Sequence, residues 1–206
     1  MTARLVTVRQ VWLALAAAMA TLAQPAGAQI TKSAQSTTGT VNLTGSVASR
    51  CGVAASGSGT SLDQTVALGE LAAANGTLRS GIEGQFANAV AAISVVCNTA
   101  APTVSISASP LSAQTNTGTP PAGFANAVAF TATVSFLTTA SAPVVLSTAS
   151  GSSASHTLSA GEGRIANSPG NVVLTASAFH TAGAADILVA DASYKGSIAV
   201  TIAPGA

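Results

Sequence analysis

Apolar and polar residues alternate in short runs along most of this chain, and turn residues separate the runs. The clearest run starts at Val128 and ends at Phe136, with an apolar side chain at every second position. A period of two predicts a β-strand that has one face in a core and one in water. Shorter runs of this kind are Val41/Leu43/Gly45/Val47, Val104/Ile106/Ala108, Val144/Leu146, Ile187/Val189 and Ile198/Val200/Ile202.

Two further runs, residues 89–96 and 172–179, are apolar on both faces and fit either central strands or helical turns. Residues 115–123 and 140–157 are rich in small polar side chains, which predicts exposed loops. Eight or nine short strands with Gly, Pro and Asn turns between them predict an all-β, antiparallel β-sandwich. The sequence contains no internal repeat of fixed length, so one main domain is expected.

The first 28 residues have the pattern of a secretory signal. Arg4 and Arg9 precede an apolar run at residues 11–23, and Ala26-Gly27-Ala28 fits a cleavage site. The run is short of the roughly 20 residues that a membrane-spanning helix needs. We therefore expect an exported protein with a signal peptide at 1–28 and a mature chain from residue 29.

Few charged residues remain in the predicted mature chain: five basic and six acidic side chains, a net charge of −1. Binding to nucleic acid depends on clustered Lys and Arg, which are missing here, so no nucleic-acid partner is expected. Disorder goes with low hydrophobicity and high net charge, and this chain has neither. A folded domain is therefore predicted.

Cys51 and Cys97 are the two cysteines of the chain. An exported protein with an even cysteine count favours a disulfide, because the bond persists in an oxidising compartment. Without a nearby His cluster, the pair is a poor candidate for a zinc site. A Cys51–Cys97 disulfide is predicted.

The sequence has few residues of the types that act in catalysis or bind metals. His156 lies in a Ser-rich segment that predicts a solvated loop, and His180 is expected at a strand end. There is no Gly-x-Ser-x-Gly elbow, and the six acidic residues show no EF-hand spacing. We therefore predict no catalytic residue, no metal or cofactor site and no small-molecule substrate; the protein is not expected to be an enzyme.

Residues 39–69 resemble the chaperone–usher pilins, specifically the type 1 fimbrial major-subunit family. The similarity consists of Gly39-Thr40-Val41, the alternating run into Cys51, and Asp63-Gln64-Thr65-Val66 before Leu68-Gly69, with the second cysteine at a typical interval. The match is specific over about thirty residues and only compositional after Cys97. The chain departs from the family at its C-terminus, where it has no tyrosine just before the end.

The resemblance implies an immunoglobulin-like sandwich at residues 48–206 that lacks its last strand and is completed by a neighbour's N-terminal extension, residues 29–47. The donor residues would be Val41, Leu43, Gly45 and Val47, and the groove edge would be Ile198, Val200 and Ile202. The implied protein is a fimbrial subunit that polymerises by donor-strand exchange and supports adhesion or biofilm formation at the cell surface. Its partners would be copies of itself or related pilins, a periplasmic chaperone and an outer-membrane usher.

Two alternatives stay open at this point. The run at residues 41–47 also fits the domain's own first strand, and the C-terminal strand could complete the sandwich within one chain. The protein would then be a self-complemented coat-type sandwich. A glycan- or surface-binding adhesin module is the other alternative, although the mature chain has few aromatic residues for such a site.

Overall fold

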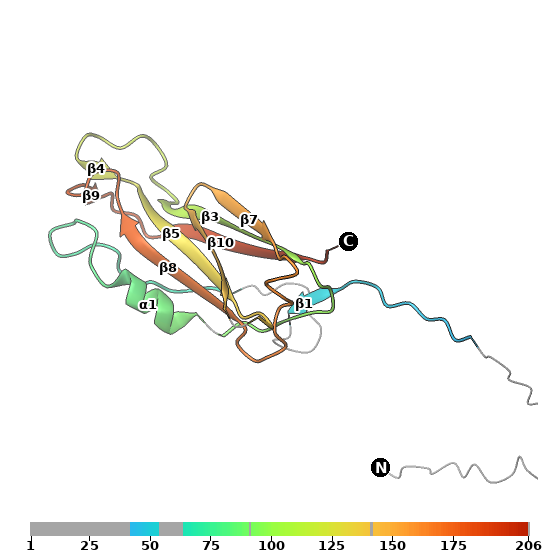
Figure 1. The fold of residues 1–206 in the computed structure, drawn as a ribbon. Helices are drawn as coiled ribbons and strands as arrows, with labels where there is room; N and C mark the ends of the chain where they lie inside the picture. Colours follow the sequence, from blue (N-terminus) through green and yellow to red (C-terminus); the bar gives the residue numbers. More distant parts are fainter. Residues whose placement is uncertain (1–41, 54–63, 91, 141, 206) are drawn as a thin grey trace, which may run out of the picture. The chain divides into compact units, whose positions relative to one another are not determined.

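The computed structural model describes residues 42–53, 64–90, 92–140 and 142–205 (Figure 1). The predicted signal at 1–28 and most of the extension, including Val41, lie outside these residues. Ser46–Ala206 forms one compact unit. The described residues of this unit form mainly β-strands with one short helix, and their strand pairings are antiparallel except for one short pair, which confirms the all-β prediction.

The strands are β1 (Cys51–Val53), β2 (Val95–Cys97), β3 (Thr103–Ala113), β4 (Phe124–Ala125), β5 (Ala127–Phe136), β6 (Val144–Ala149), β7 (Ser153–Thr157), β8 (Val172–His180), β9 (Ile187–Leu188) and β10 (Tyr194–Ala203), and the helix is α1 (Ile82–Ala89). Six strands form the main sheet in the order β10-β3-β5-β6, with β7 also paired to β3 and β8 to β5. The pairs β1-β2 and β4-β9 are separate, and β4-β9 is parallel.

Strand β5 organises the core. Its inward residues, from Val128 to Phe136, are buried at every second position, as the alternation predicted. Near its start β5 pairs with β3 at Val128–Leu111, and further along it pairs with β8 from Ala129 and with β6 from Thr131. Two groups of strands, β10-β3-β7 and β8-β5-β6, therefore branch from one junction. Their buried residues belong to one hydrophobic cluster.

The predicted disulfide between Cys51 and Cys97 is present, with an Sγ–Sγ distance of 2.06 Å. The two cysteines are register partners in the β1-β2 pair, so the covalent bond and the strand ladder hold the same two segments together. The bond closes a loop with a sequence separation of 46. On the chain-entropy model, this raises the free energy of the unfolded chain by roughly 4 kcal/mol.

Several sequence predictions are confirmed and others are corrected. The runs at Val104, Val144 and Ile198 form β3, β6 and β10, and the run at residues 172–179 is strand β8. Residues 89–96 are not one strand: α1 ends at Ala89, and β2 begins only at Val95.

Two loop and face predictions were also wrong. The predicted loop at 140–157 contains β6 and β7. In β9, Leu188 is buried and Ile187 is exposed, the reverse of the predicted face. The cause is the parallel pairing with β4, which places Leu188 beside Ala125 in a second, smaller core cluster.

Helix α1 was not predicted from the sequence. Its buried residues are Ile82 and Phe86, which are four positions apart and so lie on one helix face. Gly81 precedes the helix with φ 84°, a conformation that glycine adopts without steric cost. The Ile82/Phe86 spacing was the available signal, but Gly84 and the alanines around it made a weak helical pattern.

A β-bulge in β8 changes which residues face the core. Ala178 has φ 53°, and the register with β5 shifts between Ala129 and Thr131. The backbone N–H of Ala178 donates to Oε1 of Glu83 on α1 at 3.0 Å. The extra residue lets Phe179 turn inward and stack on Phe130, with ring centroids 5.3 Å apart.

A buried amide joins three segments that lie far apart in the sequence. Asn171 is 0 % exposed. Its Oδ1 accepts from the N–H of Val95 at 2.8 Å, and its Nδ2 donates to the carbonyls of Val95 at 2.6 Å and Ala166 at 2.5 Å. The side chain thus satisfies both backbone groups of Val95, as a neighbouring strand would.

We expect Asn171→Ala to lower the free energy of unfolding by about 3 kcal/mol, because it leaves buried backbone groups of Val95 unpaired. Urea denaturation of the wild type and the variant measures the loss. Asn98→Ala is the control: Asn98 also bonds to the backbone but is exposed, so water replaces its bonds and the loss should stay below about 1 kcal/mol. Equal losses in both variants would contradict the assignment.

We expect Ala178→Gly to raise the free energy of unfolding by about 0.5–1 kcal/mol, since relief of left-handed strain exceeds the entropy gained by the unfolded chain. Ala149→Gly, at an exposed strand position without positive φ, should instead destabilise the protein by about 0.5–1 kcal/mol. Thermal melts of the two variants should therefore shift in opposite directions. Destabilisation in both would show that Ala178 is not strained.

Candidate functional site

Strand β10 has one paired edge and one open edge. It pairs with β3 along its whole length, from Tyr194–Ala113 to Ala203–Thr103. No other described strand pairs with its opposite edge, which we call the open edge. Among the described residues, no backbone–backbone hydrogen bond outside the ladders involves Tyr194–Ala203, and the N–H of Ser197 donates to Oγ of Ser109 on the paired strand β3. A row of backbone N–H and C=O groups is thus unpaired within the described part of the chain.

The side chains of β10 continue the core outward to this open edge. Ile198, Val200 and Ile202 alternate along the strand, are half-buried, and pack against the main cluster. Other half-buried apolar residues pack on the same cluster from segments outside the sheet: Val66, Leu68, Val90, Ile93 and Cys97. The core therefore has partly covered apolar side chains from β10 and from the segments before and after α1.

The predicted donor residues lie in a segment without regular secondary structure. Residues 42–50 form no strand, which argues against their being the domain's own first strand. Leu43 is 92 % exposed and Val47 is 86 % exposed. A Cβ added at Gly45 would have no neighbouring atom within 4 Å. Val41, the remaining predicted donor residue, lies outside the described residues.

The segment before β1 is fixed to the compact unit by Asn98. Its Oδ1 accepts from the N–H of Arg50 at 2.6 Å, and its Nδ2 donates to the carbonyl of Ala48 at 2.8 Å. The N–H of Asn98 donates in turn to the carbonyl of Arg50 at 3.0 Å. These three bonds fix the point at which the chain joins the domain, next to the disulfide.

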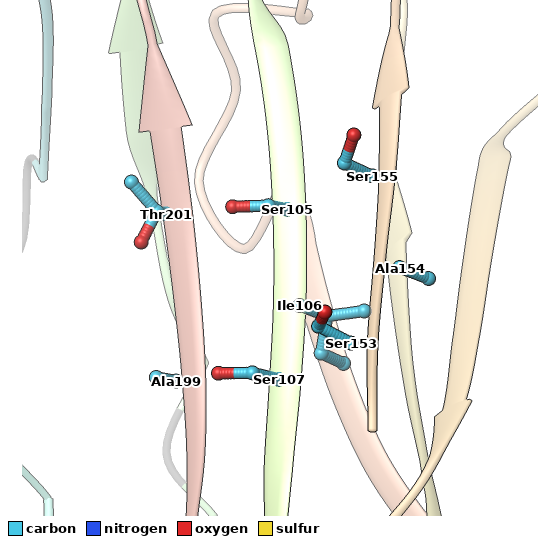
Figure 2. A pocket seen from close by; sticks show the side chains of 8 residues that line it. All are labelled: Ser105, Ile106, Ser107, Ser153, Ala154, Ser155, Ala199 and Thr201. Atoms are coloured by element: carbon cyan, nitrogen blue, oxygen red, sulfur yellow. The ribbon is translucent and has the colours of Figure 1, made fainter.

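The outer faces of the sheet carry many small hydroxyl-bearing side chains and few charges, although Val145 on β6 and Val173 on β8 are also exposed there. A shallow hollow of about 500 Å³ lies over β10, β3 and β7 and is lined by Ser105, Ile106, Ser107, Ser153, Ala154, Ser155, Ala199 and Thr201 (Figure 2). Hydroxyls also pair across strands, Thr103 with Thr157 at 2.8 Å and Thr133 with Ser147 at 2.7 Å. No residue lining the hollow is a base that could activate a serine.

Among the described residues, His156 and Glu162 are the pair that most resembles part of a catalytic site. His156 lies on β7, so its prediction as a loop residue was wrong, although its side chain is still 38 % exposed. Its Nε2 lies 2.8 Å from Oε1 of Glu162. Ser159 donates its N–H and its hydroxyl to Oε2 of Glu162, not to the imidazole. A nucleophilic serine needs its hydroxyl on the base, so this arrangement fixes a loop and activates no serine.

Other titratable residues hold loops at the far end of the sheet. Asp191 accepts backbone N–H bonds from Thr115, Asn116 and Ser193. These bonds, of which that from Ser193 has the largest effect, lower the pKa of Asp191 below its usual value. His180 ends β8, as predicted. No group of three potential metal ligands occurs among the described residues, and no helix within them has the length and apolar character to cross a membrane.

Glu162 generates a pH prediction. The N–H and hydroxyl of Ser159, followed by His156, lower the pKa of Glu162 from 4.5 to about 2. A lowered pKa in the folded state means that the carboxylate stabilises the protein above pH 4.5 and that this stability is lost as the pH falls through about 2.

We therefore expect Glu162→Gln to lower the melting temperature at pH 7 and to match the wild type near pH 2. Melting curves from pH 2 to 7 provide the measurement. Glu70→Gln, which removes an exposed acid elsewhere, controls for net charge. A wild-type–variant difference that is the same at pH 2 and pH 7 would contradict this account.

The chain was compared with known proteins at the levels of family, sequence and structure. No protein-family model, curated protein or solved structure matches it. The function must therefore be argued from the open edge of β10, the exposed N-terminal segment and the residues around them.

Proposed function

We propose that this protein is a structural subunit of a surface fimbria and that it polymerises head to tail by strand addition. The observation that carries the proposal is that one chain has both an unpaired strand edge and an exposed apolar segment. Strand β10 has an open edge beside half-buried Ile198, Val200 and Ile202, and the N-terminal segment has exposed Leu43 and Val47. The open edge needs an added strand with apolar side chains, and the N-terminal segment has apolar side chains that need a surface to cover them.

The acceptor is the open edge of β10. An unpaired strand edge is a template for another strand, and natural proteins usually cover, shorten or charge such an edge. Here the inward positions of the edge are apolar, and Lys195, the charged residue of β10, lies near its start. An added strand would pair with the backbone and cover the partly buried apolar row.

The donor is the N-terminal extension, residues 29–47, of another copy. In an extended conformation, Val41, Leu43, Gly45 and Val47 would share one face, as a donor to an alternating acceptor row must. Burying one exposed Leu or Val side chain contributes roughly 1.5–3 kcal/mol. Glycine at position 45 would allow close approach of the two backbones in the middle of the row.

The finer fold belongs to the same proposal. The groups β10-β3-β7 and β8-β5-β6 would be the two layers of an immunoglobulin-like sandwich, with the donor as its missing strand. A bond between Cys51 and Cys97 fits a protein folded in an oxidising compartment.

This assignment places the mature protein at the cell surface after removal of residues 1–28. A periplasmic chaperone would cover the open edge before assembly, and an outer-membrane usher would deliver the subunit. The protein would have a structural role in adhesion or biofilm formation and no catalytic activity of its own.

Charged substitutions in the donor segment test the proposal. We expect Leu43→Asp combined with Val47→Asp to abolish polymers, because two carboxylates would enter an apolar row. Material sheared from producing cells is run in detergent with and without boiling in acid and then immunoblotted. The wild type should give a ladder that acid boiling reduces to one band.

A matched control uses the opposite face of the same segment. Thr44→Asp combined with Ser46→Asp adds the same charge at alternate positions, so its ladder should persist. Wild-type protein that runs as a single band in both lanes would contradict the fimbrial function and favour a self-complemented domain. Polymers that survive the Leu43/Val47 change would exclude this donor segment.

A further inference from the structure

An exposed apolar pair lies at one end of the compact unit. Phe124 on β4 and Ile187 on β9 are register partners and are 42 % and 38 % exposed. Their strand neighbours Ala125 and Leu188 point the other way, into the second core cluster. We call Phe124 and Ile187 the end patch. In Figure 1 the labels β4 and β9 lie together at the end of the unit opposite β1.

The end patch is held in place from beneath. The N–H of Ile187 donates to the carbonyl of Gly123 at 2.9 Å, and the N–H of Leu188 donates to the carbonyl of Gly76 at 2.9 Å. A Cβ added at Gly76 would lie 2.9 Å from Cγ2 of Ile187, so the turn packs closely against this side chain. The two apolar side chains are thus presented on a fixed surface.

A second apolar position is exposed at the opposite end, beside the disulfide. Val96 on β2 is 45 % exposed, and Arg50 directly precedes Cys51. We call Arg50, Val96 and Asn98 the disulfide end. Strand β10 connects the two ends: its first residue, Tyr194, donates its hydroxyl to the carbonyl of Val189 near the end patch, and its last residue, Ala203, pairs with Thr103 near the disulfide end.

Chain length limits where two assembled copies can lie. Under the proposed function, on which this inference rests, donor residues up to Val47 occupy the open edge of a receiving copy. Cys51 of the donating copy follows four residues later, and four residues span at most about 14 Å. The disulfide end of the donating copy must then touch the receiving copy at the end of β10 where Val47 lies.

The direction of the donor strand decides which end is touched. If it ran parallel to β10, Val47 would lie near Ala203, at the receiving copy's disulfide end. That end already holds the receiving copy's own N-terminal segment, clamped by Asn98, which leads to the preceding copy. The preceding copy and the donating copy would then both have to contact the receiving copy's disulfide end. An antiparallel donor places Val47 near Tyr194 instead, and each end then meets one neighbour.

We infer that the end patch of one copy binds the disulfide end of the next, forming a second contact between consecutive subunits. Phe124 and Ile187 would pack on Val96, and Asp186, which precedes Ile187, would face the exposed Arg50. Two different surfaces of the same chain then meet in a heterologous contact, which does not close on itself and suits an open filament. The opposite charges favour this register.

Photo-crosslinking in assembled fibres tests the contact. Benzoylphenylalanine is placed at position 124, where the side chain is aromatic and partly exposed, and at position 175 as a control on the side of β8. After irradiation of sheared fibres, position 124 should give crosslinked dimers, and mass spectrometry should map the partner peptide to residues 46–50 or 94–98. Position 175 should give little or no crosslinking to those peptides, because it lies outside the proposed contact.

A substitution gives a second, independent measurement. Phe124→Asp should cut the yield of long polymers about tenfold, since a buried interface aromatic is lost, while Thr175→Asp leaves it unchanged. The Phe124→Asp monomer should still unfold in one cooperative transition, which separates an assembly defect from misfolding.

The two proposals fail in different ways. If fibres form normally but position 124 crosslinks to neither peptide, the end contact is wrong and strand addition stands. If the wild-type chain gives no ladder, strand addition itself fails and the end contact fails with it.

Discussion

The structure depends on one geometric constraint, the burial of every second residue of β5. Val128, Ala132, Val134 and Phe136 are all 0 % exposed, so this strand cannot slip by one position without turning its whole apolar face to water. Because β5 pairs with β3 at its start and with β6 and β8 afterwards, its register also sets the register of three other strands. The packing of the core therefore depends on the register of β5.

The edge of the sheet has the opposite character. Along β10 the inward side chains are only half-buried, although they are as apolar as those of β5. The same kind of alternation therefore has different outcomes in the two strands, complete burial in β5 and partial burial in β10. This contrast, within one continuous sheet, is the physical basis for treating β10 as unfinished.

The sequence predicted the elements that have a strong period and large side chains. Strands β3, β5 and β10 were recognised because Val, Ile and Phe alternate with Ser, Thr and Ala. Strand β7 was missed because Ser153-Ala154-Ser155-His156-Thr157 has no large apolar residue, and its pairing with β3 decides its conformation. Likewise, neither the bulge at Ala178 nor the bonds of Asn171 can be read from periodicity, since both arise from contacts with distant segments. At the candidate site, the apolar positions of β10 were predictable from their period. An unpaired edge on this strand was implied by the family resemblance alone, because periodicity does not show which strands pair.

The hydroxyl-covered faces of the sheet have a consequence for how this protein meets its surroundings. On these faces Thr103 pairs with Thr157 and Thr133 with Ser147, and Ser105, Ser107, Ser153 and Ser155 surround the hollow over β3 and β7. Dissolved ions screen fixed charges, and protons change them, but neutral hydroxyls respond to neither. The broad sides of the domain should therefore keep the same hydration in fresh water, in brine and in mildly acidic fluid, whatever happens to the charged loops at their ends.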